Sequence, residues 1–139
     1  MKVLIDTNVV LDIMLNRAPF YVSSADVEAL AEAKIITGYI SASGITDVFF
    51  LAKGKLGKKL TKKVLKNLLQ VFKPAAVTDN HIFQALDMDW DDFEDSVQFT
   101  VGESLFVDYI VTRNTKDYTS SSIPAVTPEQ FIRLIADDE

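Results

Sequence analysis

The chain has 139 residues, of which 48% are hydrophobic, and its formal net charge is −6. This length and composition predict one globular domain over residues 1–139 with a single continuous core. The absence of cysteine excludes a disulfide framework and a thiolate metal site, and the net charge argues against a surface that is basic everywhere. No apolar run reaches the roughly eighteen residues that span a bilayer, and no signal peptide is visible. We therefore expect a cytoplasmic protein without membrane association.

Hydrophobic periodicity predicts alternating strands and helices in the first half of the chain. Val3, Leu4 and Ile5 form an apolar run typical of a buried parallel strand, and the helical segments show apolar residues at helical spacing. Gly54 and Gly57 predict a break before an amphipathic helix. The predicted elements are strand Lys2–Ile5, helix Thr7–Asn16, helix Ser23–Ala33, strand Ile35–Ile40, turn Ser41–Gly44, helix Thr46–Ala52 and helix Lys58–Phe72.

The second half continues the alternation. Pro74 ends the preceding helix, and Thr127, Pro128 and Gln130 supply the cap, the first position and the capping box of a last helix. Before that helix, the predicted elements are strand Ala75–Val77, helix Asp79–Met88, helix Asp92–Leu105, strand Val107–Thr112, loop Asn114–Ser122 and strand Ala125–Val126. Five short strands separated by helices predict an α/β fold, a three-layer α/β/α sandwich around a five-stranded parallel sheet.

Charge is unevenly distributed along the chain. Between Val48 and Thr78 there is no acidic residue, whereas the segment Asp87–Asp95 is mostly acidic. The basic residues of the first region are Lys53, Lys55, Lys58, Lys59, Lys62, Lys63, Lys66 and Lys73. A lysine-rich helix beside an acidic cluster suits a polyanion bound through its backbone while cations occupy the carboxylates. Two solvated surface faces explain the same pattern without any ligand.

Four aspartates follow predicted strands or lie near predicted helix starts: Asp6, Asp47, Asp95 and Asp117. Because the carboxyl ends of parallel strands meet at one edge of a sheet, we expect these residues to lie close together. A single aspartate at a helix start is more often a cap. Four at one edge would repel one another unless a cation neutralised them. Oxygen ligands without thiolates suit Mg²⁺ or Mn²⁺, ions that usually serve phosphate esters.

Several segments of the chain resemble the PIN domain, a metal-dependent ribonuclease fold that includes the VapC-type toxins. They are Leu4–Asn8, an acid in the helix after the second strand, and Ile110–Tyr118. The stretch Asp92–Gln98 is similar to a PIN subgroup with an Asp-Phe-Glu-Asp signature. The resemblance extends to Phe131 and rests on the order and spacing of these motifs, since none is specific alone.

The resemblance implies a set of site residues. Asp6, Asp95 and Asp117 match the metal ligands of the family, and Asp47 matches a fourth catalytic acid where most members have glutamate. The polar positions implied to orient ligands or to contact a phosphate are Thr7, Asn8, Thr112 and Asn114. For a further phosphate contact, the basic candidates are Arg113, Arg17 and Lys116.

The expected reaction is hydrolysis of an RNA phosphodiester bond by metal-activated water, with Mg²⁺ or Mn²⁺ held mainly by Asp6, Asp95 and Asp117. A second ion would stabilise the leaving 3′ oxygen. A metal-independent ribonuclease would use histidine pairs, but the chain has only His81, which we expect to be structural. The family further implies a homodimer and a separate antitoxin protein that fills the active-site groove.

The sequence is also compatible with two other functions. A phosphatase of the haloacid dehalogenase type also has a strand that ends in aspartate, but it requires a second aspartate where this chain has Asn8. A catalytically weak or inactive binding module on a PIN scaffold is favoured by the shorter Asp47. Among the remaining acids, we expect Asp12 to contact solvent or to form a pair on its helix, Asp92 to cap a helix, and Asp108 to face the opposite sheet edge.

Overall fold

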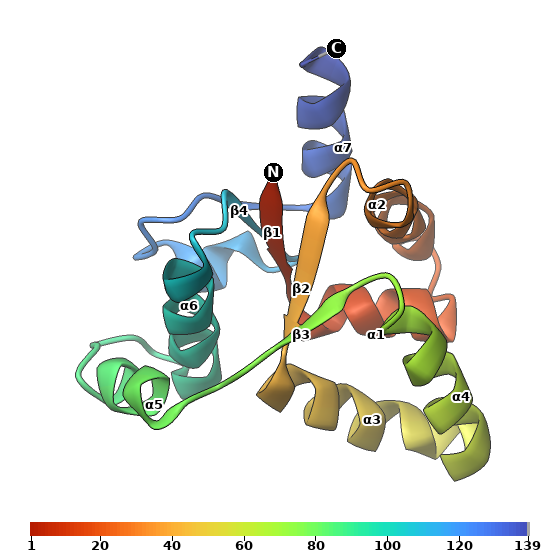
Figure 1. Ribbon diagram of the computed structural model, residues 1–139, viewed down its shortest axis with the longest axis horizontal. Coiled ribbons are helices and arrows are strands. Elements are labelled where there is room, and N and C mark those ends of the chain that lie inside the picture. The colour runs from red at the N-terminus through yellow and green to blue at the C-terminus, as the bar shows by residue number, and fades with distance from the viewer. Residues whose placement is uncertain (139) are drawn as a thin grey trace.

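A parallel five-stranded sheet forms the centre of the computed structural model, which describes residues 1–138 (Figure 1). The strands are β1 (Lys2–Ile5), β2 (Thr37–Ser41), β3 (Lys73–Ala75), β4 (Tyr109–Val111) and β5 (Ala125–Val126). They lie in the order β3-β2-β1-β4-β5, and β1 pairs with both β2 and β4. The predicted α/β sandwich with five parallel strands is therefore confirmed, and Asp6 directly follows the central strand.

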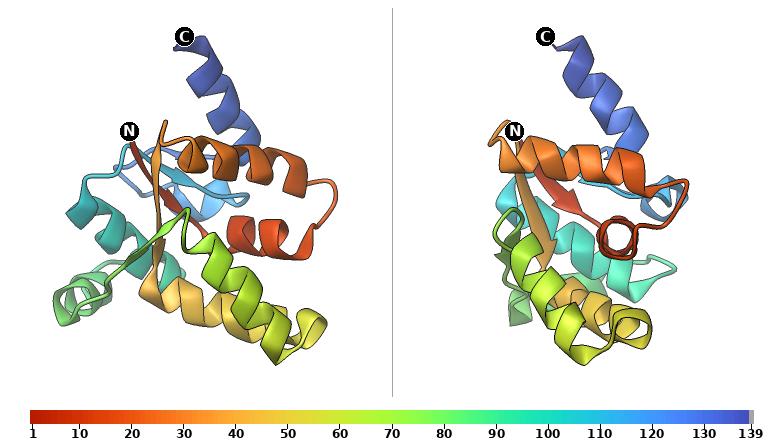
Figure 2. Two further views of the ribbon diagram at one scale, coloured as in Figure 1. Left: turned by 45° about the vertical axis from the view of Figure 1, so that its right-hand side comes forward. Right: turned by 90° about the vertical axis from the view of Figure 1, so that its right-hand side faces the viewer.

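Helices cover both faces of the sheet (Figures 1 and 2). On one face lie α1 (Thr7–Leu15), α2 (Tyr21–Glu32), α3 (Ala42–Leu56), α4 (Lys58–Leu68) and α7 (Pro128–Asp137), and on the other α5 (Asp79–Leu86) and α6 (Phe93–Leu105). A short 3₁₀-helix, η1 (Thr115–Tyr118), follows β4. None of the helices within residues 1–138 is long and apolar enough to span a membrane.

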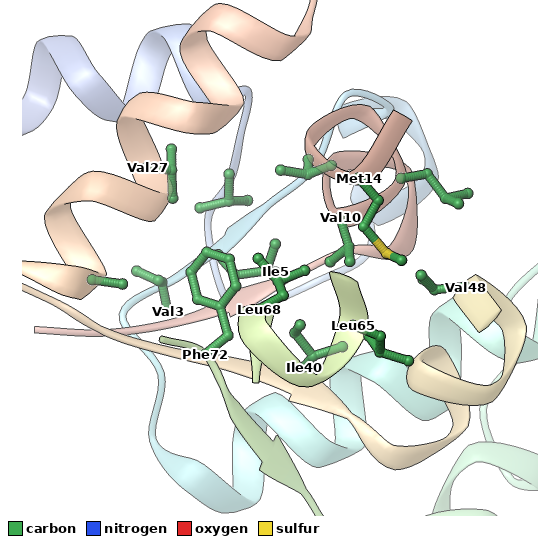
Figure 3. Packing of buried hydrophobic residues seen from close by; sticks show 14 of the residues in the cluster. Val3, Ile5, Val10, Met14, Val27, Ile40, Val48, Leu65, Leu68 and Phe72 are labelled. Atoms are coloured by element: carbon green, nitrogen blue, oxygen red, sulfur yellow. The ribbon is translucent and has the colours of Figure 1, made fainter. Parts of the chain in front are cut away.

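The central strand divides its side chains between two buried clusters. Val3 and Ile5 belong to the larger cluster, beneath α1, α2 and α4, whereas Leu4 belongs to the smaller one beneath α6. Phe72 is fully buried in the larger cluster (Figure 3). A Cβ atom on Gly38 would lie only 2.5 Å from Cδ1 of Phe72, so this position of β2 requires glycine. Alternation of side chains along one strand thus builds both layers of the core.

Helix α3 is longer than the sequence pattern predicts. It begins at Ala42, where Ser41 Oγ accepts a hydrogen bond from the backbone N–H of Gly44, and it continues through Gly54 to Leu56. Gly54 is tolerated at a cost of about 1 kcal/mol relative to alanine. The break falls at Gly57 alone, whose φ of 78° favours glycine. The predicted turn at Ser41–Gly44 is therefore the cap and first turn of α3.

Strand boundaries also differ from the predictions. The third strand is Lys73–Ala75 instead of Ala75–Val77, and it includes Pro74. Proline is accepted because β3 is the last strand on its side of the sheet, where one edge of the backbone needs no ladder partner. The predicted strands Ile35–Ile40 and Val107–Thr112 are observed as Thr37–Ser41 and Tyr109–Val111.

Candidate active site

Hydrogen bonds from neighbouring residues hold Asp6 in place. It caps α1 by accepting a bond from the backbone N–H of Thr7 (2.8 Å), and its Oδ2 accepts from Thr112 Oγ1 (2.8 Å) and Asn8 Nδ2 (3.3 Å). Burial raises the pKa of the Asp6 carboxyl, and the bonds from Thr112 and Thr7 partly oppose that rise. A carboxyl group is therefore fixed at the C-terminal end of β1, in a place where burial disfavours its charged form.

Tyr118 connects Asp6 to Asp95. Its hydroxyl lies 3.4 Å from Oδ2 of Asp6 and 3.4 Å from Oδ1 of Asp95, so these two oxygens are separated by no more than twice that distance. Burial, followed by the two neighbouring carboxylates, raises the pKa of Tyr118 far above its ordinary value, so the hydroxyl stays protonated and donates. Trp90 packs edge-on against the Tyr118 ring. The sequence does not predict a role for Tyr118, because nothing in the η1 segment indicates that this side chain points into the protein.

Asp95 lies in the first turn of α6. The predicted cap at Asp92 is present, since its Oδ1 accepts the backbone N–H of Asp95 at 3.0 Å. Burial, followed by the charges of Asp92, Asp6 and Asp117, raises the pKa of Asp95 to about 7. Repulsion among these carboxylates is therefore substantial at neutral pH, which is the condition that a bound cation relieves.

Asp47 and Glu94 share a pocket with Asp6 and Asp95. This acidic pocket has a volume of about 190 Å³ and is also lined by Gln98. The pKa of Glu94 is raised, chiefly by the charge of Asp47. Because α3 starts at Ala42, Asp47 lies in the second turn of that helix instead of the predicted first turn. Glu94 is thus a neighbour of Asp47.

Asp117 lies on the other side of Asp95. It lines a separate cleft together with Asp92, Asp95 and Lys116, and its charge contributes to the raised pKa of Asp6 and of Asp95. The four predicted aspartates therefore do gather at one sheet edge, with Asp95 lining both hollows. Asp117 is exposed, whereas Asp6 is buried.

The predicted polar positions form a chain of hydrogen bonds behind Asp6. Thr112 Oγ1 accepts the backbone N–H of Asn114 (3.1 Å), and Asn8 Oδ1 accepts the backbone N–H of Arg113 (3.1 Å). Thr7 lines the acidic pocket. The structure therefore places Asn8 and Thr112 as groups that orient the Asp6 carboxylate.

The expectation for Asp12 is wrong. Its side chain is fully buried and forms ion pairs with Nε of Arg17 (2.8 Å) and Nε of Arg113 (2.7 Å). The second pair is a close charge contact without hydrogen-bond alignment. The Arg113 guanidinium also lies 4.0 Å from the centre of the Phe20 ring. The fold closes the α1–α2 turn over Asp12, a tertiary contact that the α1 sequence does not reveal.

His81 and Asp108 have structural roles away from the acidic residues. Nδ1 of His81 accepts the backbone N–H of Thr78 (2.9 Å), and its Nε2 lies 2.9 Å from Ser104 Oγ, so this histidine caps α5 and joins it to α6. Asp108 accepts the backbone N–H of Lys2 at the opposite sheet edge, as predicted.

The sheet order and the aspartates at its C-terminal edge define an α/β protein with an acidic site. A model of the PIN domain family matches residues 2–116, and the chain belongs to this family. A search of curated protein sequences found no match.

Solved structures with the same fold include several from toxin–antitoxin systems. VapBC2 from Rickettsia felis, bound to a promoter DNA fragment, has a TM-score of 0.72 at 15% identity over 91% of this chain and 98% of that chain. A toxin–antitoxin complex from Klebsiella pneumoniae has a TM-score of 0.67 at 24% identity over 91% and 97%. VapC20 from Mycobacterium tuberculosis, a toxin that cleaves the sarcin-ricin loop, has a TM-score of 0.62 at 15% identity over 78% and 86%.

The donor set is suited to a hard divalent cation, although the ligands are not gathered into a complete shell. Among residues 1–138, no three acidic or histidine side chains form a metal-binding group. Asp6 and Asp95 nevertheless contact the same hydroxyl, and the charge of Asp117 acts on both. Carboxylate oxygens in mutual repulsion are the ligands that Mg²⁺ and Mn²⁺ prefer, so the residues present fit such an ion.

The raised pKa of Asp95 predicts a pH-dependent melting temperature in the absence of metal. The folded protein holds this proton more tightly than the unfolded chain does, so stability is present at low pH and is lost as pH rises toward about 7. In EDTA, we expect the melting temperature to fall between about pH 5 and about pH 8. At the upper end, Mn²⁺ at roughly 100 times its dissociation constant should restore about 2.7 kcal/mol.

Differential scanning fluorimetry across this pH range checks the prediction. Ca²⁺ and Na⁺ at matched ionic strength separate specific binding from general screening. A melting temperature that is independent of pH in EDTA would contradict the proposed repulsion.

Proposed function

We propose that this protein is an Mg²⁺- or Mn²⁺-dependent endoribonuclease that hydrolyses RNA phosphodiester bonds and acts as the toxin of a toxin–antitoxin pair. The observation that carries the proposal is the close approach of Asp6 and Asp95 around the Tyr118 hydroxyl, with Asp117 beside them, in a chain of the PIN family. Similarity of fold to toxin–antitoxin structures supports the biological role.

Asp6, Asp95 and Asp117 would hold the cation, with Asp47 as a further catalytic acid. A divalent ion bound there would supply an activated water and would neutralise charge on the phosphate. Thr112 and Asn8 keep the Asp6 carboxylate in one orientation through bonds of 2.8 and 3.3 Å. Fixed ligands of this kind are needed for a productive metal site.

Substrate contacts follow from the same edge of the sheet. Thr7 lines the acidic pocket, and Arg113 and Asn114 lie shortly after β4, which supports a role for these three residues in RNA binding. Asn8 and Thr112 would contribute to the same site through the Asp6 carboxylate that they orient. The lysines of α3 and α4 are exposed and form no ion pair among the contacts of residues 1–138. This leaves their charges available for the phosphate backbone.

We further propose a homodimer that acts in the cytoplasm and is inhibited by an antitoxin protein. The structural relatives include complexes of a toxin with its antitoxin. An antitoxin partner would have to cover an acidic edge, so we expect it to present arginine or lysine side chains to Asp6 and Asp95.

Cleavage of a mixed single-stranded RNA in Mn²⁺ or Mg²⁺ tests the ribonuclease. We expect cleavage that stops in EDTA, returns when metal is restored, and is absent from the Asp6→Asn variant purified in the same way. Cleavage that persists in Asp6→Asn would indicate a contaminating nuclease and would remove the support for this function.

A catalytically weak binding module is the second candidate. It is favoured by the absence of a complete metal-binding group within residues 1–138 and by the short side chain at Asp47. Calorimetry with Mn²⁺ separates the two functions, because the ribonuclease requires a bound ion. An absence of metal binding together with retained RNA binding would favour the module.

A further inference from the structure

A second pocket opens at the same edge of the sheet, on the β5 side of the acidic residues. It has a volume of about 360 Å³ and is lined by Pro19 and Phe20 before α2, by Arg113 and Asn114 after β4, and by Thr127 and Glu129 at the start of α7. We call it the arginine pocket.

The arginine pocket is connected to the candidate metal ligands by a short path. Asn114 lines the pocket, and its backbone N–H donates to Thr112 Oγ1 at 3.1 Å. The same Oγ1 donates to Oδ2 of Asp6 at 2.8 Å. A polymer bound with one phosphate at Asp6 would therefore reach this pocket with an adjacent unit.

Arg113 is held rigidly for a charged ligand. Its Nε lies 2.7 Å from the buried carboxylate of Asp12, and the face of its guanidinium lies against the Phe20 ring. These contacts do not use the two Nη groups, which can therefore bind a ligand, and the side chain is 27% exposed. A planar guanidinium that is fixed in this way can bind a phosphate with little loss of entropy.

The charge of the pocket also suits an anion. Asp12 supplies one negative charge to two arginines, Arg17 and Arg113, so one positive charge is left over. Glu129 is the acid that lines the pocket, and it already pairs with Arg133 at 2.6 Å. The remaining positive charge therefore favours a phosphate over an uncharged, apolar ligand.

Phe20 adds an apolar surface next to this charge. One face of its ring is covered by Arg113, yet the residue remains 41% exposed. Nucleobases stack on such aromatic side chains, and Asn114 and Thr127 line the same pocket and carry polar side chains that can form hydrogen bonds. A phosphate, an aromatic ring and polar edges together describe a nucleotide.

We propose that the arginine pocket binds the nucleotide adjacent to the cleaved phosphodiester, with its phosphate on Arg113 and its base on Phe20. The inference rests on the proposed ribonuclease function, and it assigns Phe20 as a residue that binds single-stranded RNA. Asp12 is then a positioning residue for Arg113.

Fluorescence anisotropy with a short labelled single-stranded RNA of mixed sequence tests the proposal. The full chain carrying Asp6→Asn, in Mg²⁺, serves as a background that does not cleave. We expect Phe20→Ala to weaken binding by roughly 5- to 100-fold, the range for loss of one stacked base, and Phe20→Trp to restore it. Phe106, which is 82% exposed beyond the opposite end of the sheet, gives the matched control Phe106→Ala.

Salt dependence tests the phosphate contact separately. Arg113→Gln should reduce the slope of log affinity against log salt concentration by about 0.7, the value for one phosphate of a single strand. Lys34→Gln removes one charge from the turn before β2, away from the carboxyl ends of the strands, and should leave the slope unchanged. If Arg113→Gln fails to fold, Arg113→Lys takes its place. This variant preserves the charge, so it should keep the slope while weakening the affinity.

The outcomes separate the pocket from the enzyme. RNA binding that is unchanged in Phe20→Ala and Arg113→Gln, with cleavage by the wild type intact, would overturn the pocket and leave the ribonuclease standing. Such a result would assign the pocket to a protein contact or to fold stability. The absence of both RNA binding and cleavage in the wild type would overturn the proposed function and this inference with it.

Discussion

Replacing Asp95 with asparagine should raise the melting temperature of the metal-free protein at about pH 8 while abolishing RNA cleavage. The carboxylate is close to Asp6, Asp92 and Asp117, and its pKa is raised to about 7 by burial and by their charges. Above that pH the wild type therefore carries a repulsive charge that Asp95→Asn removes. The amide oxygen still accepts the hydrogen bond from Tyr118, so the packing is preserved.

The same substitution removes a metal ligand under the proposed function. Metal ions contribute several kcal/mol to stabilising charge in the transition state, so we expect cleavage to fall by at least about 10³-fold. Mn²⁺ should also no longer raise the melting temperature. Stability and activity would thus change in opposite directions, a result that a general folding defect cannot produce.

Asp87→Asn is the matched control for this experiment. Asp87 belongs to the same acidic segment, but it lines neither the acidic pocket nor the cleft of Asp117. Its substitution should leave both the melting temperature and the metal response unchanged. A lower melting temperature for metal-free Asp95→Asn would contradict the electrostatic explanation, and retained cleavage would exclude Asp95 from the ligand set.

Replacing Asp12 with alanine should produce a larger loss of stability than the other substitutions considered above. Breaking a buried ion pair costs about 3–5 kcal/mol, because the remaining charge is left uncompensated. Arg17 and Arg113 are 35% and 27% exposed, so water would partly compensate them. We therefore expect a loss near the lower limit, about 3 kcal/mol in the free energy of unfolding measured with urea.

Asp12→Ala should also reduce cleavage without removing any catalytic group. Arg17 donates to the backbone oxygen of Asn8 (3.4 Å), and the Arg113 backbone binds the Asn8 side chain, which in turn contacts Asp6. Loss of a group that orients a metal ligand typically lowers activity by about 10- to 100-fold.

Asp26, an exposed acid on α2, gives the control Asp26→Ala, whose free energy of unfolding should stay within about 0.5 kcal/mol of the wild type. A stability loss below this same limit for Asp12→Ala would show that the ion pairs contribute little.

Several boundaries show where local sequence patterns become insufficient. Gly54 predicts a break, yet α3 runs through it because the Ser41 cap and the packing of Val48 and Ala52 outweigh one glycine. Pro74 argues against a strand, yet it lies in β3 because that strand is at an edge. In both cases a tertiary context overrides a weak local preference.

The candidate site likewise has features that the sequence predicts and features that it does not. The alternation of strands and helices along the chain predicted a parallel sheet. The positions of Asp6, Asp95 and Asp117 after strands or at a helix start then predicted that these acids gather at one edge. Sequence alone did not predict the Tyr118 hydroxyl between Asp6 and Asp95, because a residue in a short 3₁₀-helix has no periodicity that indicates its direction.

The sequence by itself determined the parallel α/β fold, the membership in the PIN family and the set of acids, because apolar strands and strand-end aspartates are local patterns. Only the tertiary structure decided that Asp12 is buried between Arg17 and Arg113 and that Glu94 lies beside Asp47. These contacts join segments that are independent of one another in sequence. Their energies depend on burial and distance, quantities that arise only when the helices pack against the sheet.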